Sequence, residues 1–545
     1  MSFKKLTIPE ILVNSFTKFS DNHFLGFSDE NSLTYKEVKE KIEIVIANLK
    51  KIGIRKTDKV AIFSNNMPNW GIIYFATTSI GAVAVPILPD FGSEELNIIL
   101  KHSEAKVLFV AGILDDKIQN IDKHNLKAII RTNDLKTLYP ENFDFDFSIN
   151  SNFEESINAD ENDLASIIYT SGTTGKSKGV MLTHKNICFN AVECGKVQPI
   201  REDDVFLSIL PLSHAYENTL GLILPMMNGA QVKYLRKLPT PAILVPALQS
   251  VRPTIMLSVP LIIEKIYKSK ILPAFNSKKL IKILYKIPVF RKWFNAAAGR
   301  KLIKTFGGRI RFFGIGGAKL DPIVEKFLIE AKFPYAIGYG LTETSPLIAG
   351  VNPKTVRLQS TGPKIEGIEI KLTDVNHKTG EGEIWVRGES VMKGYYKDEA
   401  LTSEVLTEDG WFKTGDLAVM DKDGYIFIKG RKKNVIIGAS GENIYPEDIE
   451  SIINNFDFVL ESIVVEEKGR LVALVHLNME EMEKKYKNFK NEMEVKLEEY
   501  KIDLLNYINT KVNKFSNVKK INIQKDPFEK TPTQKIKRYK YNSND

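Results

Sequence analysis

Short apolar runs rich in β-branched residues recur along the first 315 residues, separated by helical or loop-like stretches. The runs are Val60–Phe63, Val107–Val110, Ala128–Ile130, Ser166–Tyr169, Val205–Ile209, Thr254–Leu257 and Arg311–Ile315. Apolar residues are continuous in these runs instead of alternating with polar ones, which is typical of strands buried on both faces. The pattern therefore predicts an α/β fold with parallel-rich sheets covered by helices.

One longer stretch tests whether the chain crosses a membrane. Residues 60–89 contain no charged residue, and this uncharged stretch is long enough to span a bilayer. However, the stretch contains several Ser, Thr and Asn residues and three prolines, at Pro68, Pro86 and Pro89. These polar groups and breaks favour strand, loop, buried helix and strand, with Pro68 near the helix start.

The pattern changes twice in the second half of the chain. After about residue 360 it becomes short strands separated by Gly-rich turns, which predicts a β-rich subdomain over about 360–430. Beyond Arg431 come a strand–turn–helix passage, an apolar strand and a stretch of mixed Lys and Glu at 480–511 that is typical of a solvated helical face. We therefore predict an N-terminal domain over 1–432 and a small α+β C-terminal domain over 433–545.

Composition excludes several protein classes. Of the 545 residues, 43% are hydrophobic and 26% are charged, which is ordinary for a globular protein and unlike a disordered or collagen-like chain. The two cysteines, Cys188 and Cys194, cannot form a zinc site alone and suggest a reducing compartment. Because Glu10 interrupts the N-terminus before an apolar core of signal-peptide length, we expect a cytoplasmic protein.

The net charge of +9 is concentrated in one segment. Between Lys265 and Arg311 there are fourteen Lys or Arg residues and no Asp or Glu, so the remainder of the chain is net acidic. This local field argues against nucleic acid as a partner. The cations alternate with apolar residues that include Trp293 and Phe294. The segment therefore suits one of two roles: peripheral binding to the anionic inner face of a membrane, or a solvated helical face that covers the core.

The strongest local signal follows the apolar run that ends at Tyr169. It reads Tyr169-Thr-Ser-Gly-Thr-Thr-Gly-Lys-Ser-Lys-Gly179. Glycines allow backbone N–H groups to surround phosphate oxygens, and hydroxyl and ammonium groups add further donors. A Walker A loop is excluded because only two residues separate Gly172 from Gly175.

This loop resembles the phosphate loop of the AMP-forming adenylating enzymes, the superfamily of acyl-CoA synthetases, luciferases and peptide-synthetase adenylation domains. Six further segments match that family in order, from Gly316 to Lys535. They are Gly316-Gly-Ala-Lys-Leu320, Tyr339-Gly-Leu-Thr-Glu343, Gly410-Trp-Phe-Lys-Thr-Gly-Asp416, Gly430-Arg-Lys-Lys433, Gly441-Glu-Asn-Ile-Tyr-Pro446 and Thr531-Pro-Thr-Gln-Lys535.

The resemblance implies roles for individual residues in binding ATP. Thr170 and Glu343 would hold Mg²⁺, a hard cation that takes oxygen ligands and neutralises a triphosphate. The loop residues Ser171, Gly172, Thr173, Thr174, Gly175 and Lys176 would bind the phosphates. Thr342 would contact the α-phosphate, Tyr339 would stack on adenine, and Gly316, Gly317 and Ala318 would line the base. Asp416 would accept hydrogen bonds from the ribose hydroxyls, with Arg431 beside it.

By the same resemblance, Lys535 is the catalytic lysine that bridges the substrate carboxylate and the α-phosphate. Removing such a cation from a transition state commonly costs 10²-fold or more in rate, about 3 kcal/mol. Lys433 occupies the hinge about which the small, mobile domain would swing, and Gly441 would lie near the pantetheine channel of coenzyme A. Two positions depart from the common pattern. Ile337 replaces a polar side chain that reads adenine in many relatives. Gln534 stands where many relatives have a Gly, which the long-chain fatty acid branch often lacks too.

The substrate is indicated by Pro211-Leu-Ser-His-Ala-Tyr-Glu217, which resembles the matching segment of long-chain acyl-CoA synthetases. His214 would lie by the acyl site, and the apolar run 219–227 either lines a tunnel or forms ordinary core. We therefore predict a ligase that converts a medium- to long-chain fatty acid to acyl-AMP and then to a thioester of coenzyme A. One alternative transfers the acyl group to acyl carrier protein, an acidic partner that the basic segment from Lys265 to Arg311 would suit as well as a lipid surface. Another is a membrane-associated fatty-acid-binding protein without activity, against which Lys535 and the phosphate loop argue.

Overall fold

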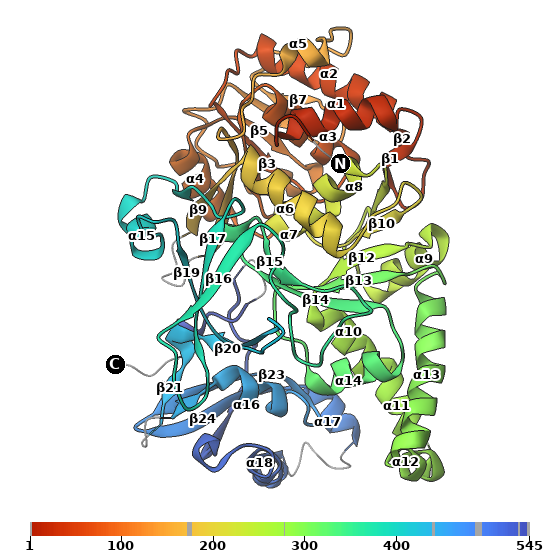
Figure 1. The fold of residues 1–545 in the computed structure, drawn as a ribbon, viewed down its shortest axis with the longest axis vertical. Helices are drawn as coiled ribbons and strands as arrows, with labels where there is room; N and C mark the ends of the chain where they lie inside the picture. Colours follow the sequence, from red (N-terminus) through yellow and green to blue (C-terminus); the bar gives the residue numbers. More distant parts are fainter. Residues whose placement is uncertain are drawn as a thin grey trace.

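Two parallel-rich, eight-stranded sheets form the bulk of the molecule (Figure 1). The computed structural model describes residues 3–171, 177–276, 278–438, 442–485, 493–531 and 535–541. The first sheet has the order β15 (Leu347–Gly350), β14 (Tyr335–Gly340), β13 (Phe312–Ile315), β12 (Ile255–Ser258), β10 (Val205–Ser208), β11 (Gln231–Tyr234), β1 (His23–Phe27) and β2 (Leu33–Thr34). Only the pairings of β15 and of β2 are antiparallel in it.

The second sheet has the order β18 (Gly394–Tyr395), β9 (Ser177–Thr183), β8 (Leu164–Ser171), β4 (Val83–Ile87), β3 (Lys59–Phe63), β5 (Ala105–Val110), β6 (Ala128–Arg131) and β7 (Thr137–Tyr139). Its central strands β8, β4, β3, β5 and β6 are parallel. All seven apolar runs of the sequence lie in strands of these two sheets, so the predicted α/β fold class is confirmed.

Helices cover these sheets. They are α1 (Ile8–Lys18), α2 (Tyr35–Lys51), α3 (Pro68–Ser79), α4 (Ser93–Ser103), α5 (Phe153–Ser156), α6 (His184–Val197), α7 (Ala215–Glu217), α8 (Leu224–Met227), α9 (Pro241–Val251), α10 (Pro260–Ile266), α11 (Leu272–Asn276), α12 (Lys279–Tyr285), α13 (Pro288–Thr305) and α14 (Pro322–Glu330). Local sequence sets several of their ends. Thr34 and Glu37 form a reciprocal capping box at the start of α2, and the Asp321 carboxylate accepts two backbone N–H groups at the start of α14.

The uncharged stretch 60–89 folds as the pattern predicted, into β3, the helix α3 and β4. Pro68 is at the first turn of α3, where a missing N–H costs nothing, and nearly all of that helix is buried. In the part of the chain that the structure describes, no helix has both the length and the apolar character needed to cross a bilayer.

The β-rich region after residue 360 is a four-stranded antiparallel sheet with the order β16 (Ile368–Thr373), β17 (Gly382–Gly388), β19 (Phe412–Met420) and β20 (Ile426–Arg431). It is not independent of the preceding chain. The segment between β17 and β19 contributes β18 to the edge of the second sheet and then forms the helix α15 (Glu399–Val405). This crossing brings Tyr395 from the β-rich region to the phosphate loop.

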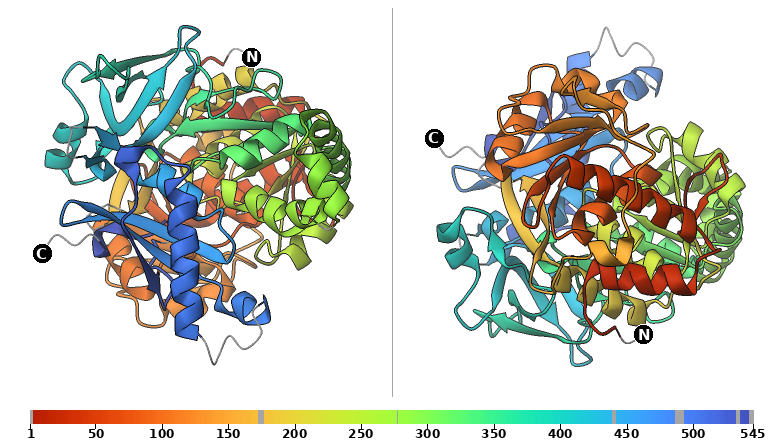
Figure 2. Two further views of the ribbon diagram at one scale, coloured as in Figure 1. Left: turned by 90° about the horizontal axis from the view of Figure 1, so that it is seen from below. Right: turned by 90° about the horizontal axis from the view of Figure 1, so that it is seen from above.

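Residues after Arg431 form β21 (Ile436–Ile437), β22 (Asn443–Ile444), α16 (Pro446–Ile453), β23 (Val459–Glu467), β24 (Arg470–Leu477), α17 (Met479–Lys485), α18 (Met493–Asn509) and β25 (Lys520–Gln524). They have an apolar core of their own, in which Ile449, Val475 and Leu504 are fully or almost fully buried. These elements lie at the bottom of Figure 1 and face the viewer in the left view of Figure 2. The domain boundary at residue 432 stays a prediction.

Candidate active site

The hairpin of β8 and β9 places one hydroxyl and one ammonium group on neighbouring strands. Thr170 in β8 lies directly opposite Lys178 in β9. The hydroxyl of Thr170 is buried, and it has no hydrogen-bond partner among the described residues. An unsatisfied buried hydroxyl costs about 1–3 kcal/mol, so it is a place where a ligand is expected.

Lys178 connects this hairpin to Glu343. Its ammonium Nζ donates to Glu343 Oε1 at 2.9 Å and to the Tyr395 hydroxyl at 2.5 Å. Tyr395 in turn donates to the same Oε1 at 2.9 Å. Glu343 lies in the short 3₁₀ turn Thr342–Thr344, which follows β14 directly. Since Lys178 is opposite Thr170, the hydroxyl and the carboxylate are brought to one place, as the proposed magnesium site requires.

The carboxylate of Glu343 is kept ionised. Burial alone would raise its pKa, but the charge of Lys178 and the hydrogen bonds from Lys178 and Tyr395 outweigh burial and lower the pKa below its ordinary value. The described residues contain no group of three or more His, Cys, Asp or Glu that could hold a metal by themselves. One carboxylate and one hydroxyl are donors of the kind that Mg²⁺ takes, because this ion is usually held by one or two carboxylates, water and substrate phosphates.

Tyr339 and Asp416 lie next to each other at the end of β14. The Tyr339 hydroxyl donates to Asp416 Oδ2 at 2.7 Å. Arg431, directly across from Asp416 in the β19–β20 ladder, places its Nε 2.8 Å from Asp416 Oδ1. Burial raises the pKa of Asp416, and the charge of Arg431 opposes this shift. Each carboxylate oxygen retains a lone pair for a further donor, as a ribose hydroxyl would require.

The glycines after β13 lie at the same edge of the first sheet. β13 and β14 are parallel neighbours with Ile315 opposite Ile337, so the turn Gly316–Ala318 and Tyr339 follow the carboxyl ends of adjacent strands. Gly317 has a φ of +84°, which a residue with a side chain rarely adopts, and it is exposed. Carboxyl ends of parallel strands are where open α/β sheets bind ligands.

Two lysines from the C-terminal region reach this edge. The charge of Lys535 acts on both His214 and Asp416, so its ammonium lies close to this edge. Burial and the neighbouring Arg431 lower the pKa of Lys535. Burial, followed by the charges of Arg431 and Lys178, lowers the pKa of Lys433 to about 8. The site thus gathers more cationic than anionic groups, which favours a polyanionic ligand.

His214 lies at the start of α7 and belongs to the same site. Burial, followed by the charge of Lys535, lowers its pKa to about 4, so the imidazole is neutral at pH 7. A neutral imidazole can orient a ligand through a hydrogen bond without adding charge beside Lys535.

Contacts between the C-terminal elements and the first sheet hold Lys535 in this position. Lys319 Nζ is 2.7 Å from Asp448 Oδ1, and Lys268 Nζ donates to the Asn454 carbonyl at 2.8 Å. The Asn455 amide donates to Asp321 Oδ2. The structure therefore shows the C-terminal elements docked with the lysine turned toward the site.

A narrow apolar cavity of about 60 Å³ begins beside this edge. Its lining includes Tyr216, Leu220, Leu257, Gly314 and Ile337. Only Leu220 and Leu224 of the run 219–227 contribute to it, and the rest of that run is buried core. The cavity is far smaller than the roughly 300–1,000 Å³ of pockets that hold drug-sized ligands, so an alkyl chain would have to displace side chains.

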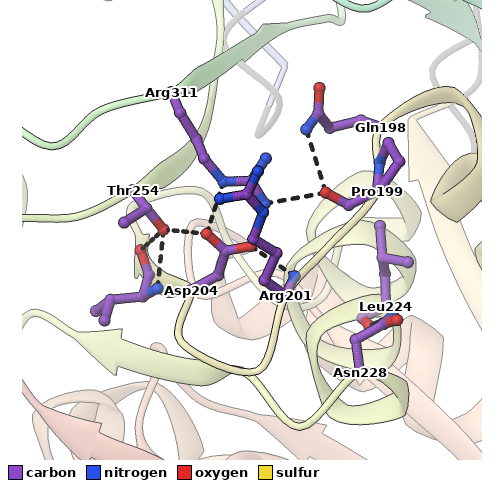
Figure 3. A network of polar contacts seen from close by, with 9 residues as sticks. Gln198, Pro199, Arg201, Asp204, Leu224, Asn228, Thr254 and Arg311 are labelled. Carbon is purple, nitrogen blue, oxygen red and sulfur yellow. Dashed lines mark hydrogen bonds and ion pairs between the residues drawn. The ribbon is translucent and has the colours of Figure 1, made fainter.

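An ion-pair network lies next in the chain to residues that line this cavity (Figure 3). The Asp204 carboxylate accepts hydrogen bonds from the Thr254 hydroxyl at 2.7 Å and from Arg311 Nε at 2.8 Å. Arg311 also donates to the Pro199 carbonyl at 2.9 Å. Pro199 lies between Gln198 and Ile200, Thr254 precedes Ile255, and Arg311 precedes Phe312. Asp204 is two residues before Phe206. These five neighbours of the network all line the cavity. The network therefore fixes loops and strand ends that are next to the cavity lining.

The structure brings most of the predicted site residues together. Thr170, Thr342, Glu343, Tyr339, Asp416, Arg431, Lys433, Lys535, His214 and the turn Gly316–Ala318 lie around one edge of the two sheets. Gly172–Lys176 and Gly441 lie outside the described residues, as does the Ser171 side chain. The roles given to these residues stay predictions.

Two residues of the site were not singled out from the sequence, namely Lys178 and Tyr395. Lys178 is within the hydroxyl-rich motif, so the motif itself could have indicated it. Its position opposite Thr170 became clear only from the β8–β9 hairpin. Tyr395 is 52 residues from Glu343 in the chain and reaches it only through the crossing of β18, so no local pattern indicated it.

Comparison with known proteins gives the family and two full-length relatives. The model of the family described as "AMP-binding enzyme" matches residues 13–396, which confirms the resemblance stated from the motifs. The chain is 29% identical to Fatty acyl-CoA synthetase A of Dictyostelium discoideum, over 96% of this chain and 88% of that protein. It is 30% identical to Long chain acyl-CoA synthetase 1 of Arabidopsis thaliana, over 95% of this chain and 88% of that protein.

A solved structure supports the fold. O-succinylbenzoate Coenzyme A Synthetase from Bacillus subtilis in complex with AMP superimposes with a TM-score of 0.76 and 22% identity, over 98% of both chains. The agreement extends over both the large sheets and the elements after Arg431, so the arrangement of layers described above is one that a solved protein adopts.

Proposed function

Because the chain belongs to the AMP-binding enzyme family, we propose that it activates a medium- to long-chain fatty acid with ATP and transfers the acyl group to coenzyme A. The products are acyl-CoA, AMP and pyrophosphate, and Mg²⁺ is the required metal ion. The names of the two relatives, a fatty acyl-CoA synthetase and a long-chain acyl-CoA synthetase, support this substrate class. The cavity beside the cationic edge is apolar, as an alkyl chain requires, but its side chains have to move apart to admit one.

In the first half-reaction, a carboxylate oxygen of the fatty acid attacks the α-phosphorus of ATP. A new O–P bond forms as the bond to the bridging oxygen breaks, and pyrophosphate leaves with that electron pair. Two anions must approach, so the ammonium of Lys535 stabilises the transition state between them. Thr170 and Glu343 would hold Mg²⁺, which would neutralise part of the phosphate charge. Thr342, next to Glu343, orients the α-phosphate.

In the second half-reaction, the sulfur of the coenzyme A thiol attacks the acyl carbon of the adenylate. A C–S bond forms, the C–O bond to phosphate breaks, and AMP leaves. Lys535 fills the site in the docked arrangement, so it has to withdraw before the thiol can enter. Rotation of the C-terminal elements at Lys433 accomplishes this.

The observation that carries this proposal is the ion pair of Lys178, which lies opposite Thr170 in the β8–β9 hairpin, with Glu343. The buried Thr170 hydroxyl has no partner among the described residues, the Glu343 carboxylate is ionised, and the charge of Lys535 acts on Glu343 and Asp416. Such an arrangement suits a magnesium triphosphate better than it suits a fatty acid alone. A fatty-acid-binding protein without activity would not need it, and no observation favours acyl carrier protein as the acceptor.

The test is a panel of fatty acids of increasing length, each supplied with coenzyme A and, separately, with the phosphopantetheine form of acyl carrier protein. AMP release and thioester formation are both measured. We expect thioester with coenzyme A for medium and long chains and little with short ones. Thioester formed on carrier protein alone would reassign the acceptor, and AMP release with no thioester on either acceptor would overturn the transfer step.

We further propose that the protein works in the cytoplasm. The supporting observations are that its two cysteines are free and buried, and that both have pKa values raised by burial, which leaves them unreactive thiols. Cell fractionation with an antibody to the chain tests this proposal, and recovery in a secreted fraction would contradict it.

A further inference from the structure

Helices α12 and α13 form a hairpin at the edge of the molecule, away from the active site. Figure 1 shows it at the lower right, and the left view of Figure 2 shows it along the right margin. No residue of α12 is buried, which is unusual for a helix that carries several apolar side chains. The outer face of this hairpin is therefore a surface that the rest of the chain does not cover.

The apolar residues of the hairpin form a continuous exposed stripe. Leu280, Ile283 and Ile287 follow one another at helical spacing and are 67%, 62% and 43% exposed. Val289, Phe290 and Trp293 at the start of α13 are 75%, 44% and 62% exposed and continue the stripe. Contiguous apolar surface of this kind marks an interaction site more often than scattered single residues do.

A basic stripe runs beside the apolar one. Lys279, Lys282 and Lys286 each precede a residue of the apolar stripe by one position, and each is exposed. None of the three forms an ion pair within the described residues, whereas Arg291 and Arg311 of the same segment are paired with Glu330 and Asp204. The positive charge on the outer face is thus uncompensated.

The inner face of the hairpin is well packed. Phe275 stacks on Tyr285 with ring centroids 4.5 Å apart, and the Tyr285 hydroxyl donates to Asn295 Oδ1 at 2.9 Å. Arg291 holds Glu330 of α14 through two of its nitrogens. The hairpin is thereby fixed to the first-sheet domain, so its outer face is presented in a defined orientation.

We infer that the α12–α13 hairpin docks the protein on an anionic lipid bilayer. Alternating lysine and apolar positions with an exposed Trp and Phe are the composition of an interfacial amphipathic element. Lysine is depleted in protein–protein interfaces, which argues against a protein partner for the same surface. The apolar side chains enter the acyl boundary while the lysines contact the headgroup phosphates, each adding attraction that salt weakens.

The experiment uses the full chain and vesicles of equal parts phosphatidylcholine and phosphatidylglycerol, with pure phosphatidylcholine vesicles alongside. We expect co-sedimentation with the anionic vesicles that weakens as salt is raised. We also expect a blue shift and quenching by brominated lipid of the fluorescence of Trp293, both absent in Trp293→Phe. Equal binding to both vesicle types, or no binding to either, would overturn the inference.

Charge reversal tests the surface itself. The triple variant Lys279→Glu, Lys282→Glu and Lys286→Glu should bind anionic vesicles roughly tenfold or more weakly. The matched control reverses Lys354, Lys378 and Lys422, which are exposed in or just before the β-rich region and change the net charge equally. Both variants should retain wild-type ATP–pyrophosphate exchange, which establishes that they are folded. The inference is wrong if the two triple variants lose vesicle affinity equally, or if acyl carrier protein competes with the vesicles for the hairpin.

Discussion

Among single side chains, Thr170 is the one whose substitution should lower activity most while leaving stability nearly unchanged. Because its buried hydroxyl has no partner in the described part of the chain, Thr170→Val should leave the free energy of unfolding unchanged or raise it by about 1 kcal/mol. The same change should lower kcat/KM for adenylation about 10- to 100-fold and raise the Mg²⁺ concentration required. Denaturant unfolding and initial rates check the two halves of this prediction.

Thr77→Val provides the control for Thr170. Thr77 in α3 has a buried hydroxyl that is also without a partner among the described residues. Its removal should affect stability as Thr170→Val does and leave adenylation unchanged. Equal losses of activity in the two variants would contradict a metal-binding role for Thr170.

Lys433 predicts a pH dependence of nucleotide binding. Its pKa is lowered to about 8 by burial and by neighbouring cations, and a bound triphosphate would favour the charged form and raise that pKa. At pH 8 ATP binding should therefore take up protons, and ATP affinity should fall as the pH rises through that value. Calorimetry in buffers of different ionisation enthalpy measures the uptake. Proton release, or no exchange in wild type and Lys433→Met alike, would contradict the assignment.

Among the secondary-structure elements, the strand ends tied by Asp204 should be the most sensitive to charge removal. Arg311→Met would leave the nearly fully buried Asp204 carboxylate without its cation and should cost about 3–5 kcal/mol of unfolding free energy. The folded-state pKa of Asp204 is lowered, so this stabilisation exists at neutral pH and is lost as the pH falls below the ordinary aspartate range. The loss should therefore shrink in acid.

The double variant Asp204→Asn, Arg311→Met tests the same pair without a stranded charge. It should be more stable than Arg311→Met alone, because no buried carboxylate remains unpaired. A double variant that is less stable than the single one would show that Arg311 contributes through packing instead. Chemical denaturation of the four proteins in the cycle decides between these outcomes.

The docking of the C-terminal elements should control the two half-reactions separately. Asn455→Asp would place a carboxylate against Asp321, which the Asn455 amide now contacts, and so weaken the docked arrangement. We expect adenylation to fall severalfold while thioester formation from supplied acyl-AMP is retained. Asn506→Asp, an identical change at an exposed position of α18, is the control. Equal loss in both half-reactions would contradict this role of the contact.

The sequence predicted the parts of the structure that depend on local pattern. Runs such as Val60–Phe63 became strands because continuous apolar residues can be satisfied only in a sheet covered on both faces. Pro68 began a helix because its fixed φ suits the first turn. Motif residues such as Glu343 and Asp416 were found because their neighbours in the chain identify them.

Long-range geometry was not predictable in the same way. The contact of Tyr395 with Glu343 depends on a strand that crosses from the β-rich region to another sheet. The narrowness of the apolar cavity depends on how side chains from five strands pack, and no single segment encodes it. The docked position of Lys535 depends on contacts such as Lys319 with Asp448, which join distant parts of the chain.

For the molecule as a whole, the two sheets, the β-rich region and the C-terminal elements meet at one edge and gather a hydroxyl, a carboxylate and several cations there. The most direct measurement is the exchange of labelled pyrophosphate into ATP in the presence of Mg²⁺ and fatty acids of increasing length, with Lys535→Ala alongside. We expect exchange that requires a fatty acid, is strongest for medium to long chains, and falls about 100-fold or more in Lys535→Ala. Exchange that responds to no fatty acid, or that is unchanged in Lys535→Ala, would contradict the adenylation site described here.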